Sequence, residues 1–346
     1  MRIGNKEIGI GKPVYIICEG GVTNYGQFNL GKQQVDVAVD AQTDCIKFQA
    51  WKTEELVSRR IADRLQSELK FNWFQRLKEK EFAFEEIKSL FEYAKERGIT
   101  VFATPHDEIA LEFLVSELKQ EVLKVGSGEA HNFKFLAAVG KRKKPVIISF
   151  GFQTDSEIVK AVETLTKAGA PEVIALHCVS LYPTPYEFGQ LKRIEHLQKL
   201  LNIPIGISDH SVGWHIPLAA VALGACVVEK HLTFDKTDPR SLDNPSALLP
   251  EEFKTFVGQI RDLEKALVNN PSEKQRQDLK KARDWLGQCL VAKQDISVGT
   301  VLTEDLILFK RPGLNGLPPS ALPEVLGRKL KTLIARDDQI LFENLE

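Results

Sequence analysis

Eight short apolar runs lie between residues 14 and 231, and polar side chains occur at or just after the C-terminal end of each run. A hydroxyl at any one of these positions would usually be a helix cap or a solvated loop residue. The repetition at every run end predicts a shared site instead. In chain order the polar residues are Glu19, Lys47, Gln49, Thr104, Lys124, Ser127, Glu129, Ser149, Ser180, Tyr182, Ser208, Asp209, His210, Glu229 and His231.

The residue types favour an anionic ligand. Lys47 and Lys124 would neutralise a phosphate or a carboxylate, and neutral hydroxyl donors would orient it. His210 and His231 end the last two runs, where two imidazoles with open positions would suit a divalent ion such as manganese. Two histidines this far apart in sequence are by themselves a weak metal signal. His177 lies within an apolar run and is interpreted as a core or supporting histidine.

The apolar runs predict strands because they are short, rich in Val and Ile, and apolar on both faces. Amphipathic segments at 83–97, 155–168 and 251–267 predict helices between or after them. Eight strands alternating with helices over about 250 residues predict an α/β fold of the TIM-barrel type, with a doubly wound open sheet as the alternative. The predicted strands are 14–19, 45–49, 100–104, 122–125, 145–149, 173–178, 204–208 and 226–231.

The chain of 346 residues divides by composition into three parts. Residues 1–268 hold the barrel, and no long lid loop is expected among them. Residues 269–287 are polar and charged, which is typical of a linker with some helical character. Residues 288–346 are rich in proline, glycine and turn signals, and they predict a small, mostly β second domain.

The overall composition excludes several classes of partner. A formal net charge of −1 leaves no basic excess for nucleic acid or an anionic membrane. No apolar run approaches the roughly 20 residues that span a bilayer. The N-terminal segment lacks the apolar stretch of a signal peptide, so we expect a cytoplasmic protein. The five cysteines show no CxxC spacing, which favours buried free thiols over a disulfide framework.

Several motifs, in one order over nearly the whole chain, resemble those of the sialic acid synthase family, which includes the legionaminate and pseudaminate synthases. They include Ile17-Cys18-Glu19, Ile46-Lys47-Phe48-Gln49, Lys124-Val125-Gly126-Ser127-Gly128-Glu129, Tyr182-Pro183-Thr184-Pro185-Tyr186-Glu187, Gly206-Ile207-Ser208-Asp209-His210 and Glu229-Lys230-His231. The resemblance implies condensation of phosphoenolpyruvate with an N-acylated sugar aldehyde, N-acetylmannosamine or a related hexosamine. The products would be a sialic-acid-like nonulosonic acid and phosphate.

The resemblance also implies a role for each position. His210 and His231 would hold a divalent metal, Mn²⁺ with Mg²⁺ or Co²⁺ as alternatives, which polarises the aldehyde. Glu19 would move protons during the reaction. Phosphoenolpyruvate would be bound by Lys47, Thr104, Lys124, Ser127, Ser149, Ser180 and Ser208, and the sugar by Gln49, Glu129, Tyr182, Asp243 and Arg311.

The last domain resembles the antifreeze-like, or SAF, domain of these synthases. In that family two chains exchange these domains in a homodimer, and each domain covers the partner's barrel. The resemblance therefore implies a domain-swapped homodimer in which Arg311 reaches the acyl group of the acceptor. Without it, an arginine before Pro-Gly would be interpreted as a solvated loop residue.

Loops near Thr23, Phe150 and Arg240 depart from the family pattern. Phe150 and Phe152 are expected to bring large aromatic side chains near the phosphate pocket, and the loop containing Asp243 is one residue longer than usual. The departures leave a second hypothesis open, a catalytically lapsed barrel that is retained for sugar binding or assembly. A metal hydrolase is disfavoured because the sequence offers no third strong ligand beside the two histidines.

Overall fold

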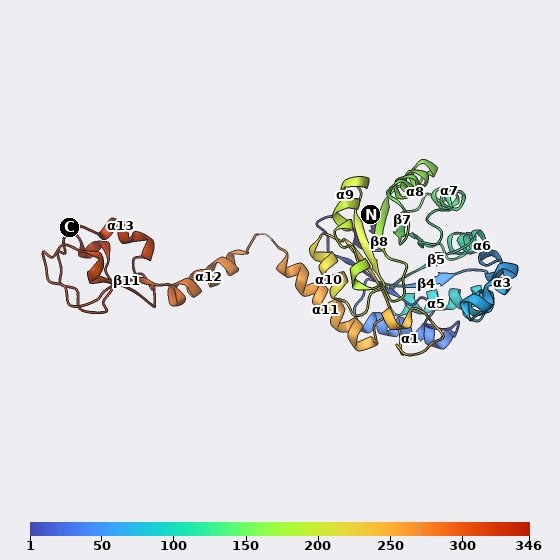
Figure 1. Ribbon diagram of the computed structural model, residues 1–346, viewed down its shortest axis with the longest axis horizontal. Coiled ribbons are helices and arrows are strands. Elements are labelled where there is room, and N and C mark those ends of the chain that lie inside the picture. Colours follow the sequence, from blue (N-terminus) through green and yellow to red (C-terminus); the bar gives the residue numbers. More distant parts are fainter. Residues whose placement is uncertain (269) are drawn as a thin grey trace. The chain divides into compact units, whose positions relative to one another are not determined.

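The apolar runs form eight parallel strands in the computed structural model, which describes residues 1–268 and 270–346 (Figure 1). The order around the sheet is β5-β4-β3-β10-β9-β8-β7-β6. The final barrel strand in the chain, β10, therefore pairs in parallel with the first, β3. The predicted (β/α)₈ barrel is confirmed, because a doubly wound sheet would reverse the strand order. The strands are β3 (Tyr15–Glu19), β4 (Cys45–Ala50), β5 (Thr100–Pro105), β6 (Leu123–Val125), β7 (Val146–Phe150), β8 (Val173–Cys178), β9 (Ile205–Asp209) and β10 (Val227–His231).

One junction of the barrel differs from the others. Strands β5 and β6 lie side by side, yet within residues 1–268 they share no strand ladder. The buried side-chain amide of Gln120 takes the place of backbone groups there. Its Oε1 accepts from the Ala103 backbone N–H at 2.8 Å, and its Nε2 donates to the carbonyls of Ala103 at 2.9 Å and Val122 at 2.7 Å.

Helices pack around the outside of the strands (Figure 1). Local sequence sets their limits, as α8 illustrates: Thr154 and Glu157 form a capping box at its start, and Gly169 follows its end. The helices are α1 (Phe28–Asp40), α5 (Phe84–Glu96), α6 (Glu108–Glu112), α7 (Phe133–Gly140), α8 (Asp155–Ala168), α9 (Arg193–Leu201), α10 (His215–Ala222) and α11 (Pro250–Ala266), with a π-turn at Phe113–Glu117 and 3₁₀ turns at Tyr186–Phe188 and Asn244–Ser246.

Residues 51–82 make an excursion between β4 and α5 that the apolar pattern does not predict. It contains α2 (Thr53–Leu56), α3 (Arg59–Leu69) and α4 (Trp73–Lys78). Asn72 caps α4 by accepting a hydrogen bond from the Gln75 backbone N–H. A two-stranded hairpin of β1 (Arg2–Ile3) and β2 (Lys6–Glu7) precedes the barrel.

The chain separates into two units, Met1–Leu267 and Val268–Glu346. In the second, β11 (Cys289–Ala292) pairs antiparallel with β12 (Ile307–Lys310) over a small apolar core of its own. Its helices are α12 (Glu273–Leu286) and α13 (Leu322–Val325), with 3₁₀ turns at Glu304–Leu306, Pro319–Ala321 and Phe342–Asn344. The predicted small, mostly β domain is therefore present.

Two further expectations can be compared with the structure. All five cysteines are buried free thiols, as predicted. In the part of the chain that the structure describes, none of the helices has the length and apolar character needed to cross a membrane.

Candidate active site

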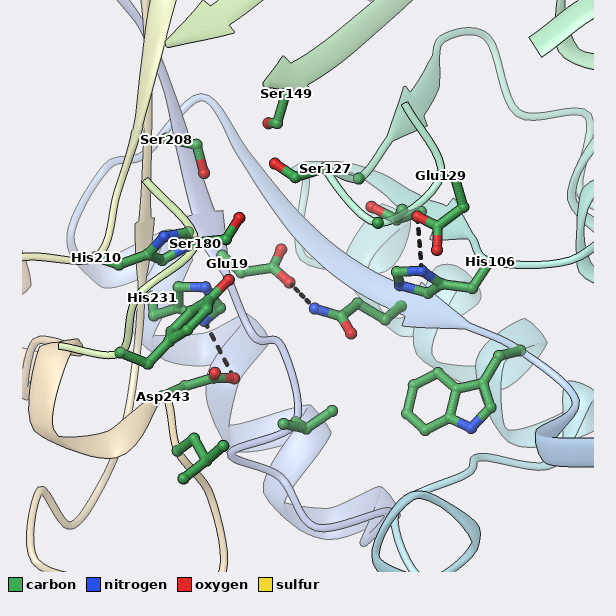
Figure 2. A pocket seen from close by; sticks show the side chains of 18 of the residues that line it. Glu19, His106, Ser127, Glu129, Ser149, Ser180, Ser208, His210, His231 and Asp243 are labelled. Carbon is green, nitrogen blue, oxygen red and sulfur yellow. Dashed lines mark hydrogen bonds and ion pairs between the residues drawn. The ribbon is translucent and has the colours of Figure 1, made fainter. Parts of the chain in front are cut away.

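A cavity of about 420 Å³ opens at the C-terminal ends of the barrel strands. The structure brings to its lining every residue of the first unit for which the family resemblance implies a role, including Asp243 from the loop that follows β10. Asp209, also predicted from its place at a run end, does not line the cavity and binds Lys230 instead. Figure 2 shows hydroxyl, imidazole and carboxylate groups converging from different strands. Arg311 is not among them, since it follows β12 in the second unit, where it is exposed.

Four buried charges form the deepest part of the cavity, which we call the ionic base: Glu19, Lys47, Lys124 and Glu229. Lys47 Nζ lies 2.5 Å from Glu19 Oε2. Glu229 lies between the lysines, 3.7 Å from Lys47 Nζ and 3.8 Å from Lys124 Nζ. Two cations therefore face two carboxylates, and each of the four side chains is no more than 6% exposed.

Burial and neighbouring charges act in opposite directions on the pKa values of the ionic base. Burial alone would lower the pKa of Lys47, but Glu19 and Glu229 outweigh it and raise that pKa. Burial lowers the pKa of Lys124 because Glu229 compensates only partly. Burial would raise the pKa of Glu229, yet the two lysines and His231 hold it well below its usual range. The geometry thus favours a charged but mutually neutralised base.

Hydroxyl groups surround the two lysines. Lys47 donates to Thr104 Oγ1 at 3.1 Å, and Lys124 donates to Ser149 Oγ at 2.7 Å. Ser208 Oγ donates to Glu229 Oε1 at 3.0 Å. Ammonium and hydroxyl donors on neighbouring strands are therefore gathered around one space, the arrangement expected for binding a phosphate or carboxylate.

Ser127 and Ser180 face the same space from the loops after β6 and β8 (Figure 2). Gly151 lies between them, and a Cβ there would be only 2.0 Å from Ser180 Oγ and 2.8 Å from Ser127 Oγ. Any side chain at this position would therefore displace both hydroxyls.

The two phenylalanines near this region have different environments. Phe152 lines the cavity, as expected, and is 61% exposed. Phe150 does not, since it is 4% exposed within the apolar core outside the strands. The expectation for Phe150 is wrong because side chains alternate along a strand, and Ser149 occupies the inward position.

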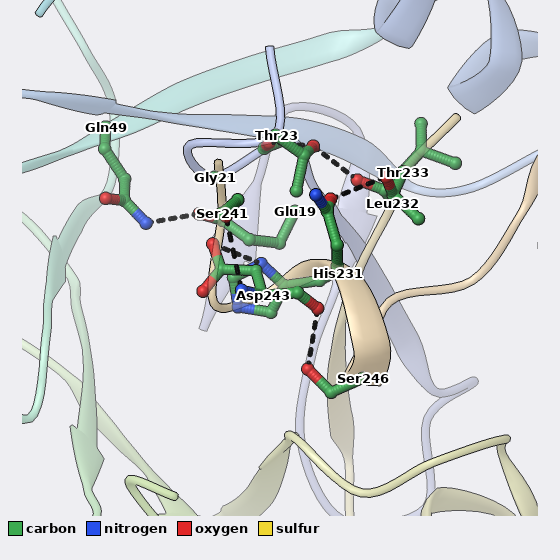
Figure 3. Close-up of polar contacts among 12 residues, drawn as sticks. Glu19, Gly21, Thr23, Gln49, His231, Leu232, Thr233, Ser241, Asp243 and Ser246 are labelled. Carbon is green, nitrogen blue, oxygen red and sulfur yellow. Dashed lines mark hydrogen bonds and ion pairs between the residues drawn. The ribbon is translucent and has the colours of Figure 1, made fainter. Parts of the chain in front are cut away.

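Glu19 lies at the end of β3 with only 1% of its surface exposed. Besides its contact with Lys47, it accepts a hydrogen bond from Gln49 Nε2 at 2.9 Å (Figure 3). A carboxylate fixed at a cavity wall by two donors is well placed to take or give a proton.

The two candidate metal-ligating histidines lie next to each other, with ring centroids 5.2 Å apart. His210 Nδ1 donates to the Val179 carbonyl at 2.9 Å, which leaves the Nε2 lone pair free for a ligand. His231 Nδ1 lies 3.5 Å from Asp243 Oδ2, beyond normal hydrogen-bond reach, and has no hydrogen-bond partner among the described residues. The donor set therefore fits a divalent ion with open positions.

The surroundings of the two histidines bear on how many protein ligands a metal would have and on how the two rings are held in place. Across the described ranges there is no cluster of three or more His, Cys, Asp and Glu side chains arranged to hold a metal. Behind the histidines, the fully buried Lys230 Nζ lies 2.5 Å from Asp209 Oδ2 and 2.6 Å from the Ser211 carbonyl. This contact ties the end of β9 to β10 and so fixes the separation of the two imidazoles.

The altered loop after β3 packs directly on His231 (Figure 3). Gly21 has φ +51°, and a Cβ there would lie 2.8 Å from His231 Nδ1. Thr23 Oγ1 donates to the Leu232 carbonyl at 2.6 Å, which joins the loop to the segment after β10. The loop therefore keeps a close fit around the histidine although its sequence departs from the family pattern.

The longer loop after β10 is also anchored (Figure 3). The Asp243 backbone N–H donates to Ser241 Oγ at 3.2 Å, and Ser246 Oγ donates to the Asp243 carbonyl at 2.9 Å. These bonds hold the Asp243 carboxylate toward His231. The extra residue in the loop thus does not remove Asp243 from the cavity.

Several cavity residues were not singled out as site residues from the sequence. His106 Nδ1 lies 3.1 Å from Glu129 Oε2, and its buried Nε2 has no partner among the residues that the structure describes. Burial would raise the pKa of Glu129, but His106 lowers it. Glu229 is among the polar run-end residues predicted from the sequence, but no role was assigned to it; it faces the cavity together with His231, whereas Lys230 between them faces outward. His177 is buried outside the cavity and donates to the Gly189 carbonyl at 2.8 Å.

The excursion at 51–82 supplies the outer wall of the cavity. Its contribution is both apolar and cationic: Trp51, Leu56, Val57, Trp73, Arg76, Leu77 and Lys80. The sequence predicts no such wall, because short amphipathic helices rich in charge are typical of a solvated surface.

Both the barrel and the second domain match known protein families. A model of the NeuB family matches residues 34–271, and a model of the SAF domain matches residues 287–346. A solved structure of N-acetylneuraminic acid (sialic acid) synthetase from Leptospira borgpetersenii, in complex with citrate, has a TM-score of 0.72 at 34% identity, covering 81% of this chain and 95% of that one. The chain belongs to the NeuB family, and the predicted resemblance is confirmed.

Two relatives show the range of the family. N,N'-diacetyllegionaminic acid synthase from Campylobacter jejuni is 34% identical, over 96% of this chain and 100% of that protein. N-acetylneuraminate-9-phosphate synthase from Mus musculus is 36% identical, over 96% of this chain and 93% of its own length. The relatives are sialic and other nonulosonic acid synthases, which supports a synthase role for this chain.

Proposed function

We propose that this protein condenses phosphoenolpyruvate with an N-acylated hexosamine in its aldehyde form and with water, giving a nonulosonic acid and phosphate. The observation that carries the proposal is the meeting of the ionic base, its ring of hydroxyls and two adjacent histidines in one cavity. An anion pocket, a site for an electrophile activator and a proton-handling carboxylate are what this chemistry requires.

Bond changes in the proposed reaction can be assigned to the chain's own groups. The methylene carbon of phosphoenolpyruvate forms the new bond to the aldehyde carbon, and the aldehyde oxygen takes up a proton. Water adds to the neighbouring carbon of phosphoenolpyruvate and gives up a proton, for which Glu19 is the base. Phosphate then leaves with cleavage of its bond to that carbon, while the added hydroxyl becomes the carbonyl group and gives its proton to the departing phosphate, so no net proton is consumed.

Lys47, Lys124 and the surrounding hydroxyls would hold the phosphate and carboxylate of phosphoenolpyruvate. Both lysines are already charged against Glu19 and Glu229, so they would bind the incoming anion without a large rearrangement. His210 and His231 would hold the divalent ion, manganese in our proposal. Such an ion supplies Lewis-acid polarisation of the aldehyde carbonyl when it is bound.

We further propose that the protein acts as a domain-swapped homodimer in which Arg311 completes the partner's site. An enol-derived intermediate open to water would be protonated or hydrolysed, so the barrel mouth must be covered during the reaction. The SAF domain is the element we assign to exclude water. Arg311 would then present its planar donor fork to the acyl carbonyl of the acceptor.

The function is tested by phosphate release from phosphoenolpyruvate over a panel of N-acylated hexosamines with manganese. We expect phosphate and a nonulosonic acid in equal amounts with one acceptor, and none after chelation until manganese is restored. Phosphate release without a new carbon–carbon bond, or full activity in excess chelator, would contradict the proposal. Sugar binding without turnover on any acceptor would favour the catalytically lapsed barrel.

Metal binding is measured separately by electron paramagnetic resonance of free Mn²⁺. The wild-type protein should remove Mn²⁺ from solution, and His210→Ala should not. The matched control is His177→Ala, which removes a buried histidine outside the cavity. Equal Mn²⁺ uptake by His210→Ala and the wild type would remove His210 from the metal site.

The two relatives named above are a synthase of a phosphorylated product and a synthase of an unphosphorylated one. Membership of the family therefore does not fix the acceptor.

A further inference from the structure

Two cations on the outer wall of the cavity lack the carboxylate partners that the ionic base has. Lys80, just after α4, is 6% exposed and lines the cavity. Its Nζ makes no hydrogen bond or ion pair with any residue in the described ranges 1–268 and 270–346. An ammonium at a cavity wall, on a side chain that is otherwise buried and without a carboxylate partner, favours an anionic ligand in that cavity.

The position of Lys80 is set by the backbone. Its N–H donates to the Leu77 carbonyl at 3.1 Å, and a Cβ on Gly26 would lie 3.1 Å from Lys80 Cα. Because the chain is enclosed here, the side chain cannot turn freely toward bulk water. Burial lowers the pKa of Lys80 to about 8, and the charge of Arg76 acts in the same direction, while Asp243 and Glu79 oppose it.

Arg76 is the second cation of this wall. Its Nη2 donates to the backbone carbonyls of Pro239 at 2.8 Å and Arg240 at 3.2 Å, and its guanidinium lies 4.7 Å from the Phe71 ring centroid. All these partners are neutral, and no carboxylate among the described residues forms an ion pair with Arg76. Arg240, in contrast, is paired with Asp238 through its Nε and Nη2 at 2.6–3.1 Å. The excess charge is therefore carried by Arg76 and Lys80, which we call the cationic wall.

The cationic wall stands where two cavities meet. Arg76 and Lys80 line both the active-site cavity and a neighbouring cavity of about 470 Å³. Asp243, which lies 3.5 Å from His231, is also among the charges that act on Lys80. The wall is thus close enough to the histidine pair for one bound molecule to reach both.

The position of the reacting aldehyde determines which part of the acceptor can contact the cationic wall. The aldehyde must lie beside His210, His231 and Glu19 for the new bond to form. The only primary hydroxyl of a hexose is at the opposite end of its six-carbon chain, where it can carry a phosphate ester. A dianionic monoester would neutralise the two cations of the wall, whereas a uronic carboxylate carries a single charge.

We propose that the acceptor is a hexosamine phosphate, with its phosphate monoester at the carbon remote from the aldehyde and bound by Lys80 and Arg76. The product would be a nonulosonic acid that keeps this ester. The inference rests on the proposed function, since it names the acceptor of the same site.

The proposal is tested by steady-state kinetics with N-acetylmannosamine, its 6-phosphate and the matching uronic acid. We expect kcat/KM for the 6-phosphate to exceed that for the other two by about 100-fold, the range of a hydrogen-bonded charge. Lys80→Met should lower kcat/KM for the 6-phosphate by about 10- to 100-fold, with less than about a threefold change for N-acetylmannosamine. Lys80→Arg should restore most of the loss.

Lys78→Met is the matched control because Lys78 is exposed and pairs with Glu54 and Glu81. It should leave kcat/KM unchanged for every acceptor. Equal kcat/KM for the phosphorylated and unphosphorylated sugars would overturn the proposal. So would an equal loss for both sugars in Lys80→Met, or a preference for the uronic acid.

Direct calorimetry separates this inference from the proposed function. N-acetylmannosamine 6-phosphate, titrated without phosphoenolpyruvate, should bind the wild type at least about tenfold more tightly than it binds Lys80→Met. If no acceptor gives product but this difference holds, the proposed function fails and the anion site stands. If only unphosphorylated sugars give product and the difference is absent, the function stands and the anion site fails. Lys80→Met removes a buried charge, so its thermal midpoint at pH 7 should equal or exceed that of the wild type.

Discussion

The ionic base and the cationic wall both contain cationic side chains, but these are paired with carboxylates only in the ionic base. In the base, Lys47 and Lys124 face Glu19 and Glu229, so the cations are compensated before any substrate arrives. In the wall, Arg76 contacts neutral groups, and Lys80 Nζ has no partner among the described residues.

This contrast separates two tasks. The ionic base comes from the ends of barrel strands. Its charges are already arranged for the proposed condensation, which is the same for every acceptor. The wall comes from an excursion between β4 and α5. In our proposal its charge is neutralised only by a phosphorylated acceptor. Reaction type and substrate choice are therefore carried by different parts of the chain.

The largest expected effect is the loss of turnover when Glu19 of the ionic base is replaced. Glu19→Gln should lower turnover by about 10²- to 10⁴-fold, the usual range for acid–base catalysis, with little change in the apparent affinity for phosphoenolpyruvate. The loss should be the same for phosphorylated and unphosphorylated acceptors, as measured by initial rates. Glu54→Gln, at an exposed position, is the control. Near-normal turnover with much weaker phosphoenolpyruvate binding would reassign Glu19 to recognition.

A smaller effect is expected from mixing two inactive variants, His210→Ala and Arg311→Ala. If Arg311 acts on the partner's barrel, each mixed dimer has one site with both residues intact. Random exchange in a symmetric dimer should then restore up to about a quarter of wild-type activity. Fluorescence energy transfer between labelled chains would verify the exchange. Exchange without recovery of activity would mean that Arg311 acts within its own chain or has no role in the site.

The smallest effect concerns the stability of the wall. Because the folded-state pKa of Lys80 is about 8, below the ordinary 10.5, the folded protein loses this proton before the unfolded chain does. The wild type should therefore gain stability relative to Lys80→Met as the pH rises from 7 to 10. Thermal midpoints over this range measure the trend.

Lys78→Met should show no such trend, since Glu54 and Glu81 raise the pKa of Lys78 and both states stay protonated up to about pH 10. A difference between wild type and Lys80→Met that is independent of pH would show that Lys80 is not desolvated.

The barrel and the residues of its mouth could be predicted because both depend on local patterns. Buried strands leave continuous apolar runs, and parallel topology places all their C-terminal ends at one rim. Strand alternation would also have assigned Phe150 to the core, once Ser149 was placed inside.

The wall could not be predicted in this way. Lys80 lies in the sequence Lys78-Glu79-Lys80-Glu81, which is typical of a solvated surface. Its burial arises from the approach of the loop at Gly26, distant in sequence, and a pattern within one segment cannot report that contact. The pairing of His106 with Glu129 likewise depends on the closing of the barrel.

The barrel is held together less strongly at the junction of β5 and β6, which Gln120 bridges, than at its other junctions. Where the other neighbouring strands are held by ladders of backbone bonds, β5 and β6 are joined through the amide of one side chain. Local opening should occur most readily along this line, and amide hydrogens of β5 and β6 should exchange with solvent earlier than those of β3 and β10. His106 follows β5 and Glu129 follows β6, so the same opening would part this pair. Of the ionic base, only Lys124 lies on this line, since Glu19, Lys47 and Glu229 come from β3, β4 and β10.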